Sequence, residues 1–246
     1  MSESLEPQSS VSGQSSAKQA KPQYTSPFDA PGIMPACSED WQAKRRVADA
    51  ARDLISALVT CTSSAEDLTA AAQQIEAQAA VLRQSEQLYG RSQFEQRQGG
   101  VYKQTMGSLG YELNPMDGQS NPIASHFDMW FENDRVHGKV FMDWQYEGPP
   151  NSVHGGFVAA LFDQFLGVGQ TLTGQPGFTG TLAVRYIKPT PIATQLRLEG
   201  WVEKVEGRKN ILKAEMWAGD VKTATCEGLF ISVTKAMVDA LKSSRQ

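Results

Sequence analysis

One segment of the chain constrains the fold more than any other, because it joins a glycine-rich turn to a long apolar helix. The turn reads His154-Gly155-Gly156, and the residues from Phe157 to Val168 are apolar on nearly every side of a helix. A helix of this pattern needs protein around it rather than water. The sequence therefore predicts a central helix that is buried within the fold.

A single carboxylate, that of Asp163, interrupts this apolar helix. Aspartate is rarely buried unless it is paired, because an isolated charge in an apolar setting is unstable without hydrogen-bond donors. The glycines at the helix start leave room for a ligand to reach the free N–H groups and the positive end of the helix dipole. An oxyanion or a polarised carbonyl binds well at such a position, so the layout is typical of a reaction site.

These residues resemble the hotdog-fold acyl-CoA thioesterases of the PaaI-like group, and within it the THEM type. A second segment, from Thr179 to Pro191, is similar to the family's second signature, in which a threonine-led strand ends in a basic residue and Pro-x-Pro. The turn at 207–210 and the run from Glu227 to Val233 resemble the family's last hairpin and its closing strand. The resemblance covers residues 121–234, which is under half of the chain.

The pattern of β-type runs agrees with the fold that this resemblance implies. Turn signals separate the runs, and the predicted strands cover about 127–131, 136–144, 179–188, 195–205, 211–217 and 222–233. We predict an α+β hotdog fold, in which an antiparallel sheet wraps around the central helix, over residues 121–235. The exposed sheet edge and partly open helix face of such a domain also predict a homodimer or homotetramer.

The resemblance implies that the chain hydrolyses acyl-CoA thioesters without a metal ion or another cofactor. In this hypothesis Asp163 is the general base or the nucleophile, the N–H of Gly155 donates to the oxyanion, and Thr179 orients the attacking water. The structural alternatives are that Asp163 only holds an interface and that Thr179 only opens a strand.

Weaker roles fall to five further residues. Three of them are interpreted as positioning the substrate, namely His154, Gly156 and Asn151. Arg208 and Lys209 lie on a predicted hairpin tip, where they either bind the phosphates of coenzyme A or are simply solvated. Two other functions stay open: a hotdog protein that binds acyl-CoA without hydrolysing it, and an interaction protein that acts through its N-terminal helices.

The residues before the hotdog segment divide into three predicted parts. Residues 1–38 have the composition of a disordered tail, 39–90 have the periodicity of a helical hairpin, and 91–120 read as a Gly- and Gln-rich connection. The second helix begins after Ser64, a good N-cap residue, and carries an apolar residue at every seventh position: Leu68, Ile75, Leu82 and Tyr89. We expect this face to pack on the first helix, with a seam against a partner as the alternative. Residues 236–246 form a C-terminal tail.

Composition excludes several other classes of protein. A net charge of −4 and a pI of about 5.5 argue against nucleic acid as a partner, because duplex binding needs a basic surface. The cysteines are three in number and far apart, which predicts neither a disulfide framework nor a metal site. No run is long and apolar enough for a membrane span, and the N-terminus has no signal-peptide pattern, so we expect a cytoplasmic protein.

Overall fold

The computed structural model of the chain describes residues 38–97, 99–100, 102, 105–175, 177–234, 236–237 and 240. The helices in this part of the chain are α1 (Glu39–Thr60), α2 (Ala65–Arg83), α3 (Arg91–Gln96), α4 (Met106–Leu113) and α5 (Gly155–Gly169), with short 3-10 helices η1 (Trp144–Tyr146) and η2 (Gln170–Thr173). The strands are β1 (Phe127–Glu132), β2 (Arg135–Met142), β3 (Gly177–Tyr186), β4 (Thr194–Glu206), β5 (Lys209–Ala218) and β6 (Val221–Ser232).

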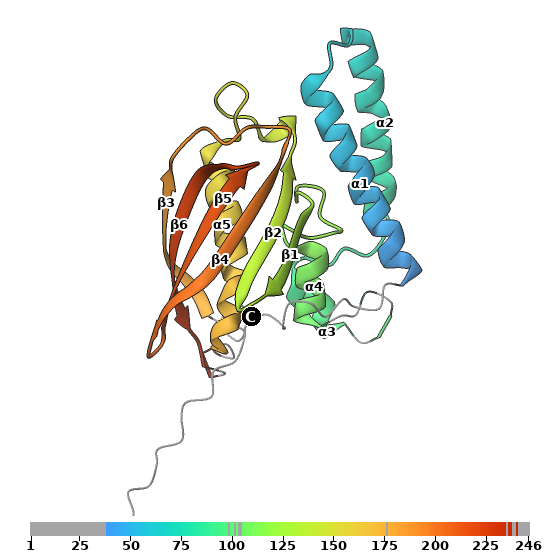
Figure 1. The fold of residues 1–246 in the computed structure, drawn as a ribbon. Coiled ribbons are helices and arrows are strands. Elements are labelled where there is room, and N and C mark those ends of the chain that lie inside the picture. Colours follow the sequence, from blue (N-terminus) through green and yellow to red (C-terminus); the bar gives the residue numbers. More distant parts are fainter. Residues whose placement is uncertain are drawn as a thin grey trace, which may run out of the picture.

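The strands form one antiparallel sheet in the order β1-β2-β4-β5-β6-β3, and the sheet curves around α5 (Figure 1). Neighbours along the chain pair as hairpins, except that β3 follows α5 and pairs with β6 at the far side of the sheet. β1 and β3 are therefore the two edges of the sheet. The α+β hotdog fold predicted from the sequence is confirmed.

The main core lies between α5 and the sheet. α5 buries side chains at helical spacing: Val158, Leu161, Phe162, Phe165 and Leu166. The ring of Phe165 stacks on that of Phe127 with 6.0 Å between the centroids. Two glycines in the sheet make room for Phe165, because a Cβ atom would lie 3.1 Å from its ring at Gly138 and 2.9 Å from it at Gly200. The close approach of α5 to the sheet thus depends on residues without side chains.

A second, smaller core joins α1, α3 and α4. Trp41 of α1, Phe94 of α3 and Leu109 of α4 pack against one another and are almost fully buried. This cluster corrects one prediction, because the segment 91–120 was expected to be a connection and instead contains α3 and α4. A few large apolar residues among glycines and glutamines are enough to form two short helices when Trp41 covers them.

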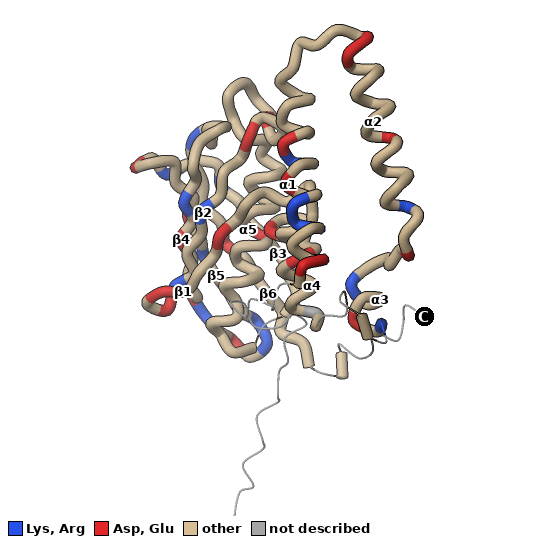
Figure 2. Tube along the Cα trace, turned by 90° about the vertical axis from the view of Figure 1, so that its right-hand side faces the viewer, with Lys and Arg blue, Asp and Glu red and all other residues tan. Residues whose placement is uncertain are grey.

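α1 packs on the hotdog domain, whereas α2 does not pack on anything in the described part of the chain. Ser64 caps α2 as predicted, and its side chain accepts a hydrogen bond of 3.1 Å from the N–H of Asp67. No residue of α2 is buried, however, and Leu68 and Ile75 are 40% and 43% exposed. The expectation that the apolar face of α2 packs on the first helix is therefore wrong. α1 uses its buried side against the domain and the two helices diverge (Figure 2).

The central helix also differs from its prediction. Its apolar pattern predicted burial on every side, but within one chain Phe157 is 37% exposed and Asp163 is exposed too. The sheet covers one side of α5, and within the described part of the chain no second layer covers the side that carries Asp163. An apolar pattern indicates that a surface is covered in the folded protein, but it does not show whether this chain or another chain covers it.

Two predictions about the ends of the chain concern residues of which little or nothing is described. The tail predicted over 1–38 lies outside the described residues except for Ser38, which caps α1. The tail predicted over 236–246 lies outside them except for residues 236, 237 and 240.

Among the described helices, none is both long and apolar enough to cross a membrane.

The close approach of α5 to the sheet predicts a cost for any side chain at Gly200. We expect Gly200→Ala to lower the free energy of unfolding by about 1–3 kcal/mol, because the new methyl group overpacks against Phe165. The measurement is chemical denaturation of the purified protein. Gly110→Ala, in α4, is the matched control: its Cβ would make only an ordinary contact, 3.5 Å from Arg91 Nη1, so it should not destabilise the chain. Equal effects of the two substitutions would contradict this account.

Candidate functional site

Backbone hydrogen bonds fix the loop that leads into α5. The N–H of His154 donates to the carbonyl of Tyr146 at 2.9 Å, and the N–H of Val153 donates to the carbonyl of Thr190 at 2.8 Å. Gly148 lies directly under this loop, where a Cβ atom would come within 2.7 Å of the Cα of His154. The segment that follows β3 thus holds the start of α5 in place, and position 148 has no room for a side chain.

The two glycines at the start of α5 present different N–H groups. The N–H of Gly156 donates to Nδ1 of His154 at 3.0 Å, so the histidine caps the helix with an unprotonated nitrogen. The N–H of Gly155 has no acceptor among the described residues. Gly155 rather than Gly156 therefore offers a free donor at the positive end of the helix.

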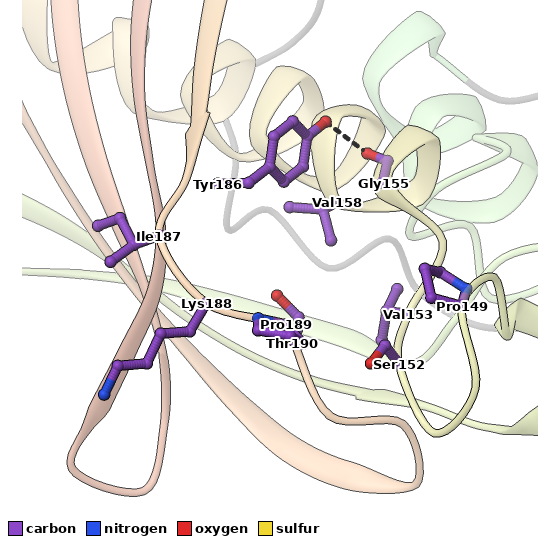
Figure 3. A pocket seen from close by; sticks show the side chains of 10 residues that line it. All are labelled: Pro149, Ser152, Val153, Gly155, Val158, Tyr186, Ile187, Lys188, Pro189 and Thr190. Carbon is purple, nitrogen blue, oxygen red and sulfur yellow. Dashed lines mark hydrogen bonds between the residues drawn. The ribbon is translucent and has the colours of Figure 1, made fainter.

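A cavity of about 370 Å³ opens beside this helix start (Figure 3). It is lined by Pro149, Ser152, Val153, Gly155, Val158, Tyr186, Ile187, Lys188, Pro189 and Thr190. The hydroxyl of Tyr186 donates a hydrogen bond of 2.8 Å to the carbonyl of Gly155, while the side chain of Lys188 extends away from the helix start. Tyr186 was not among the predicted site residues. Its signal in the sequence was its place at the end of a strand, just before the Lys-Pro exit.

The second half of the site is a hydrogen-bonded pair in the middle of α5. The hydroxyl of Thr179, on β3, donates to Oδ1 of Asp163 at 2.8 Å. Both side chains are exposed in the single chain. The structure therefore brings together the two residues that were predicted to act as a pair, and among the described residues the second carboxylate oxygen of Asp163 accepts no hydrogen bond.

The two halves of the site are far apart within one chain. Gly155 and Asp163 are separated by eight residues of one helix, which places them roughly 12 Å apart along its axis. A carbonyl group that accepts from Gly155 cannot also be adjacent to Asp163 of the same chain.

The thiol closest to this site is not a nucleophile. Cys226 pairs with Val184 in the β3–β6 ladder and is buried. Burial, together with the nearby charges of Asp163 and Glu227, raises the pKa of the Cys226 thiol to about 12. Since the thiolate is the reactive form, Cys226 stays protonated and inert at neutral pH.

The remaining predicted residues lie outside the cavity. Asn151 has a left-handed backbone with φ of 58°, and its N–H donates to Glu147 Oε1 at 2.7 Å.

Arg208 donates from Nε to the carbonyl of Ser232 at 2.9 Å. Arg208 and Lys209 lie at the β4–β5 turn, and Gln175, which follows α5, donates to the carbonyl of Gly207 in that turn. The turn is therefore at the opposite end of α5 from Gly155.

A further carboxylate, that of Asp117, contacts the middle of α5 from the loop after α4. Gln164, the neighbour of Asp163, donates from Nε2 to Asp117 Oδ2 at 2.9 Å and accepts from Asn114 at 3.1 Å. Burial raises the pKa of Asp117 and outweighs the opposing effect of the hydrogen bond from Gln164, so that the pKa lies at about 6. This contact ties the helical N-terminal region to the helix that carries Asp163. Within the described ranges, no group of His, Cys, Asp and Glu side chains has the arrangement of a metal site.

Residues 150–225 match the family model of the thioesterase superfamily. This part of the chain is a thioesterase-superfamily domain. Its sequence relatives include the acyl-coenzyme A thioesterases THEM4 of Xenopus laevis, 34% identical over 74 residues, and of Bos taurus, 33% identical over 89 residues. The matched segments are 30% and 35% of this chain, and they span about a third of the relatives, 33% and 36% of their lengths.

The likeness of the thioesterase-superfamily domain to a solved structure extends beyond the domain itself. A crystal structure of a thioesterase superfamily protein superposes with a TM-score of 0.63 and 28% sequence identity. The alignment covers 80% of this chain and 97% of the other. The hotdog strands and α5 supply less than this share of the chain, so part of the N-terminal helical region belongs to the common architecture.

The raised pKa of Asp117 predicts how stability depends on pH. The folded chain holds this proton more tightly than the unfolded chain, whose carboxyl has a pKa near 3.8, so stability falls as the pH rises from 3.8 through about 6. Asp117→Asn removes this loss and can still accept from Gln164. The Tm difference between variant and parent should therefore grow in favour of the variant from about pH 4 to about pH 7.

The measurement for Asp117 is a series of thermal melts across that pH range. Asp220→Asn, in the exposed β5–β6 turn, is the control and should change Tm little. A Tm difference for Asp117→Asn that is the same at every pH would show that burial of the charge is not the cause.

Proposed function

We propose that this chain hydrolyses acyl-CoA thioesters to the free acid and coenzyme A. The observation that carries the proposal is the hydrogen bond between Thr179 and Asp163, which joins an exposed carboxylate to a hydroxyl beside a helix whose first N–H group is free. The names of the THEM4 relatives, which are acyl-coenzyme A thioesterases, support this choice of reaction and substrate.

Each group has a separate task in this reaction. The thioester carbonyl accepts a hydrogen bond from the N–H of Gly155, and the helix dipole stabilises the negative charge that develops on its oxygen. Asp163 takes the proton from a water molecule that attacks the carbonyl carbon, or attacks that carbon itself. Thr179 donates to Oδ1 of Asp163 and so fixes the orientation of the carboxylate. His154 holds the Gly-Gly turn by accepting from Gly156.

The active site in this proposal is shared between two copies of the chain. Gly155 and Asp163 of one copy are too far apart, and the surface around them is apolar and exposed: Phe157 is 37%, Phe178 is 40% and Tyr186 is 54% exposed. Among the described strands, β3 is also a sheet edge, with a partner strand on one side only. A two-fold axis beside antiparallel α5 helices covers this surface and places Gly155 of one copy against Asp163 of the other.

In the same two-fold arrangement, the basic β4–β5 turn with Arg208 and Lys209 contributes to the binding of coenzyme A. Within one chain Arg208 and Lys209 lie at the C-terminal end of α5. Antiparallel α5 helices bring that end of the second copy toward the cavity beside Gly155. The two cations then lie on the side from which the phosphates of coenzyme A approach.

The first test of the reaction is the removal of the carboxylate charge. Asp163→Asn keeps the shape of the side chain, so we expect turnover of acyl-CoA to fall by roughly 10²-fold or more while the fold is kept. Thr179→Ala removes an orienting group rather than the base and should cost less. The measurement is thiol release from a panel of short, medium, long and aromatic acyl-CoAs, with circular dichroism as the check on folding.

Two outcomes would overturn these assignments. Turnover close to that of the parent chain in a folded Asp163→Asn variant would remove Asp163 from the chemistry. A loss for Thr179→Ala larger than that for Asp163→Asn would mean that the two roles have been exchanged.

The shared site is tested by mixing two inactive variants. Gly155→Pro removes the N–H donor, and proline suits this place because it is the first residue of the helix and His154 before it has a φ of −58° and a ψ of 130°. Equal amounts of Gly155→Pro and Asp163→Asn are unfolded together and re-associated. Half of the resulting dimers are mixed, and each has one complete site, so about a quarter of the parent activity should return.

Each variant refolded alone is the control and should stay inactive. Native mass spectrometry reports whether mixed dimers have formed. Mixed dimers without recovered activity would favour a site that is built within one chain.

A further inference from the structure

The peptide group between Gly155 and Gly156, at the start of α5, is held at both ends by side chains. Its N–H, which belongs to Gly156, donates to Nδ1 of His154 at 3.0 Å. Its carbonyl, which belongs to Gly155, accepts a hydrogen bond of 2.8 Å from the hydroxyl of Tyr186 (Figure 3). His154 directly precedes the helix, whereas Tyr186 is the last residue of β3. The sheet and the loop before α5 therefore meet at this one peptide group.

Two consecutive glycines would otherwise leave the start of α5 loosely defined. Glycine restricts its backbone dihedral angles less than any other residue, and the first N–H groups of a helix have no partner within the helix. The free N–H of Gly155 and the carbonyl that Tyr186 holds belong to the same residue, so two rotatable bonds separate them. The ring of Tyr186 also lies against Gly155, where a Cβ atom would be 3.5 Å from it. A fixed carbonyl therefore limits the directions in which this N–H can point.

Tyr186 itself is attached to a rigid part of the sheet. It ends the ladder between β3 and β6, and the N–H groups of Ile187 and Lys188 both donate to the carbonyl of Thr223, at 2.8 and 3.0 Å. The backbone is thus fixed on both sides of Tyr186. A group that a strand carries is placed more precisely than one on a free loop, so the hydroxyl of Tyr186 is suited to holding another group in position.

A β-bulge at Gly180 lets β3 contact α5 with both Thr179 and Tyr186. These two residues are seven apart, and residues an odd number apart point to opposite faces of a regular strand. Both nevertheless donate hydrogen bonds to α5. The pairing with β6 passes directly from Thr179 to Thr181, so Gly180 is one residue in excess and shifts the alternation by one. One strand therefore reaches both halves of the candidate site.

We propose that Tyr186 is a positioning residue for the proposed hydrolysis of acyl-CoA, on which this role rests. Its hydroxyl holds Gly155 so that the free N–H of that residue points to the carbonyl oxygen of the thioester. Negative charge develops on this oxygen only as the carbonyl carbon is attacked, so a well-directed donor stabilises the transition state more than the bound substrate. Loss of the Tyr186 hydroxyl should therefore lower kcat and leave KM almost unchanged.

The first test removes the hydroxyl and keeps the ring. Tyr186→Phe in the full chain should lower kcat roughly tenfold, less than the loss expected from removing the Gly155 donor itself, and should change KM by less than about twofold. Tyr89→Phe is the matched control, because that tyrosine is 78% exposed and its hydroxyl makes no hydrogen bond among the described residues. It should keep the kcat and KM of the parent chain. The measurement is thiol release from the acyl-CoA panel.

The outcomes separate this role from the proposed function. A parent-like kcat for Tyr186→Phe would overturn the positioning role and leave the hydrolysis in place. A raised KM with an unchanged kcat would also overturn it, because Tyr186 would then contact the substrate rather than act through Gly155. A parent chain that hydrolyses none of the acyl-CoAs would remove the proposed function and, with it, the role of Tyr186.

The second test observes the start of α5 without any substrate. Removal of the Tyr186 hydroxyl should raise the rate of amide hydrogen exchange at the start of α5 by about threefold to tenfold, which is the effect of one lost hydrogen bond. Mass spectrometry of the exchanged full chain gives this rate. Peptides from α1 should exchange at the parent rate, and so should the start of α5 in Tyr89→Phe. An unchanged rate at the start of α5 in Tyr186→Phe would overturn the proposal, whatever its kcat.

Discussion

The packing of α5 on the sheet determines where the other parts of the domain can lie. Phe165 and its apolar neighbours occupy the space that Gly138 and Gly200 leave open, and this contact fixes both the position of the helix and its rotation about its own axis. Once the side with Phe165 faces the sheet, the side with Asp163 has to face outward. The packing of the apolar side chains of α5 therefore decides where the carboxylate of Asp163 lies.

This rotation separates the candidate site into two halves with different chemistry. The start of α5 offers a free N–H group at the positive end of a dipole, beside a cavity bounded by Tyr186. The middle of α5 offers a carboxylate oriented by Thr179. Neither half is enclosed by its own chain, and the apolar side chains around both are exposed. Incomplete cover is a liability for a monomer, but it is what a subunit that shares its site with a second copy requires.

The N-terminal helices α1 and α2 also differ in how much of their surface the described part of the chain covers. α1 is tied to the domain by buried side chains and by hydrogen bonds from Arg52, and Asp117 links the loop after α4 to α5. α2 has no such contacts and carries an apolar row instead. The described part of the chain therefore leaves two apolar surfaces uncovered, one on β3 and α5 and one on α2, and these elements lie at opposite sides of the molecule (Figure 1).

The sequence by itself determined where the six strands and the helix with Asp163 lie along the chain, because alternating and helical apolar patterns and turn residues act locally. The resemblance to the hotdog thioesterases then implied the fold, whereas the order of the strands in the sheet came from the structure. It also pointed to Thr179, through a signature rather than through geometry. It did not determine that 91–120 would form helices, that α2 would stand apart from α1, or that Asp163 would be exposed. Those features depend on which surfaces meet across long stretches of sequence. Only the tertiary structure decided them, because a local pattern shows that a residue needs cover but not what provides it.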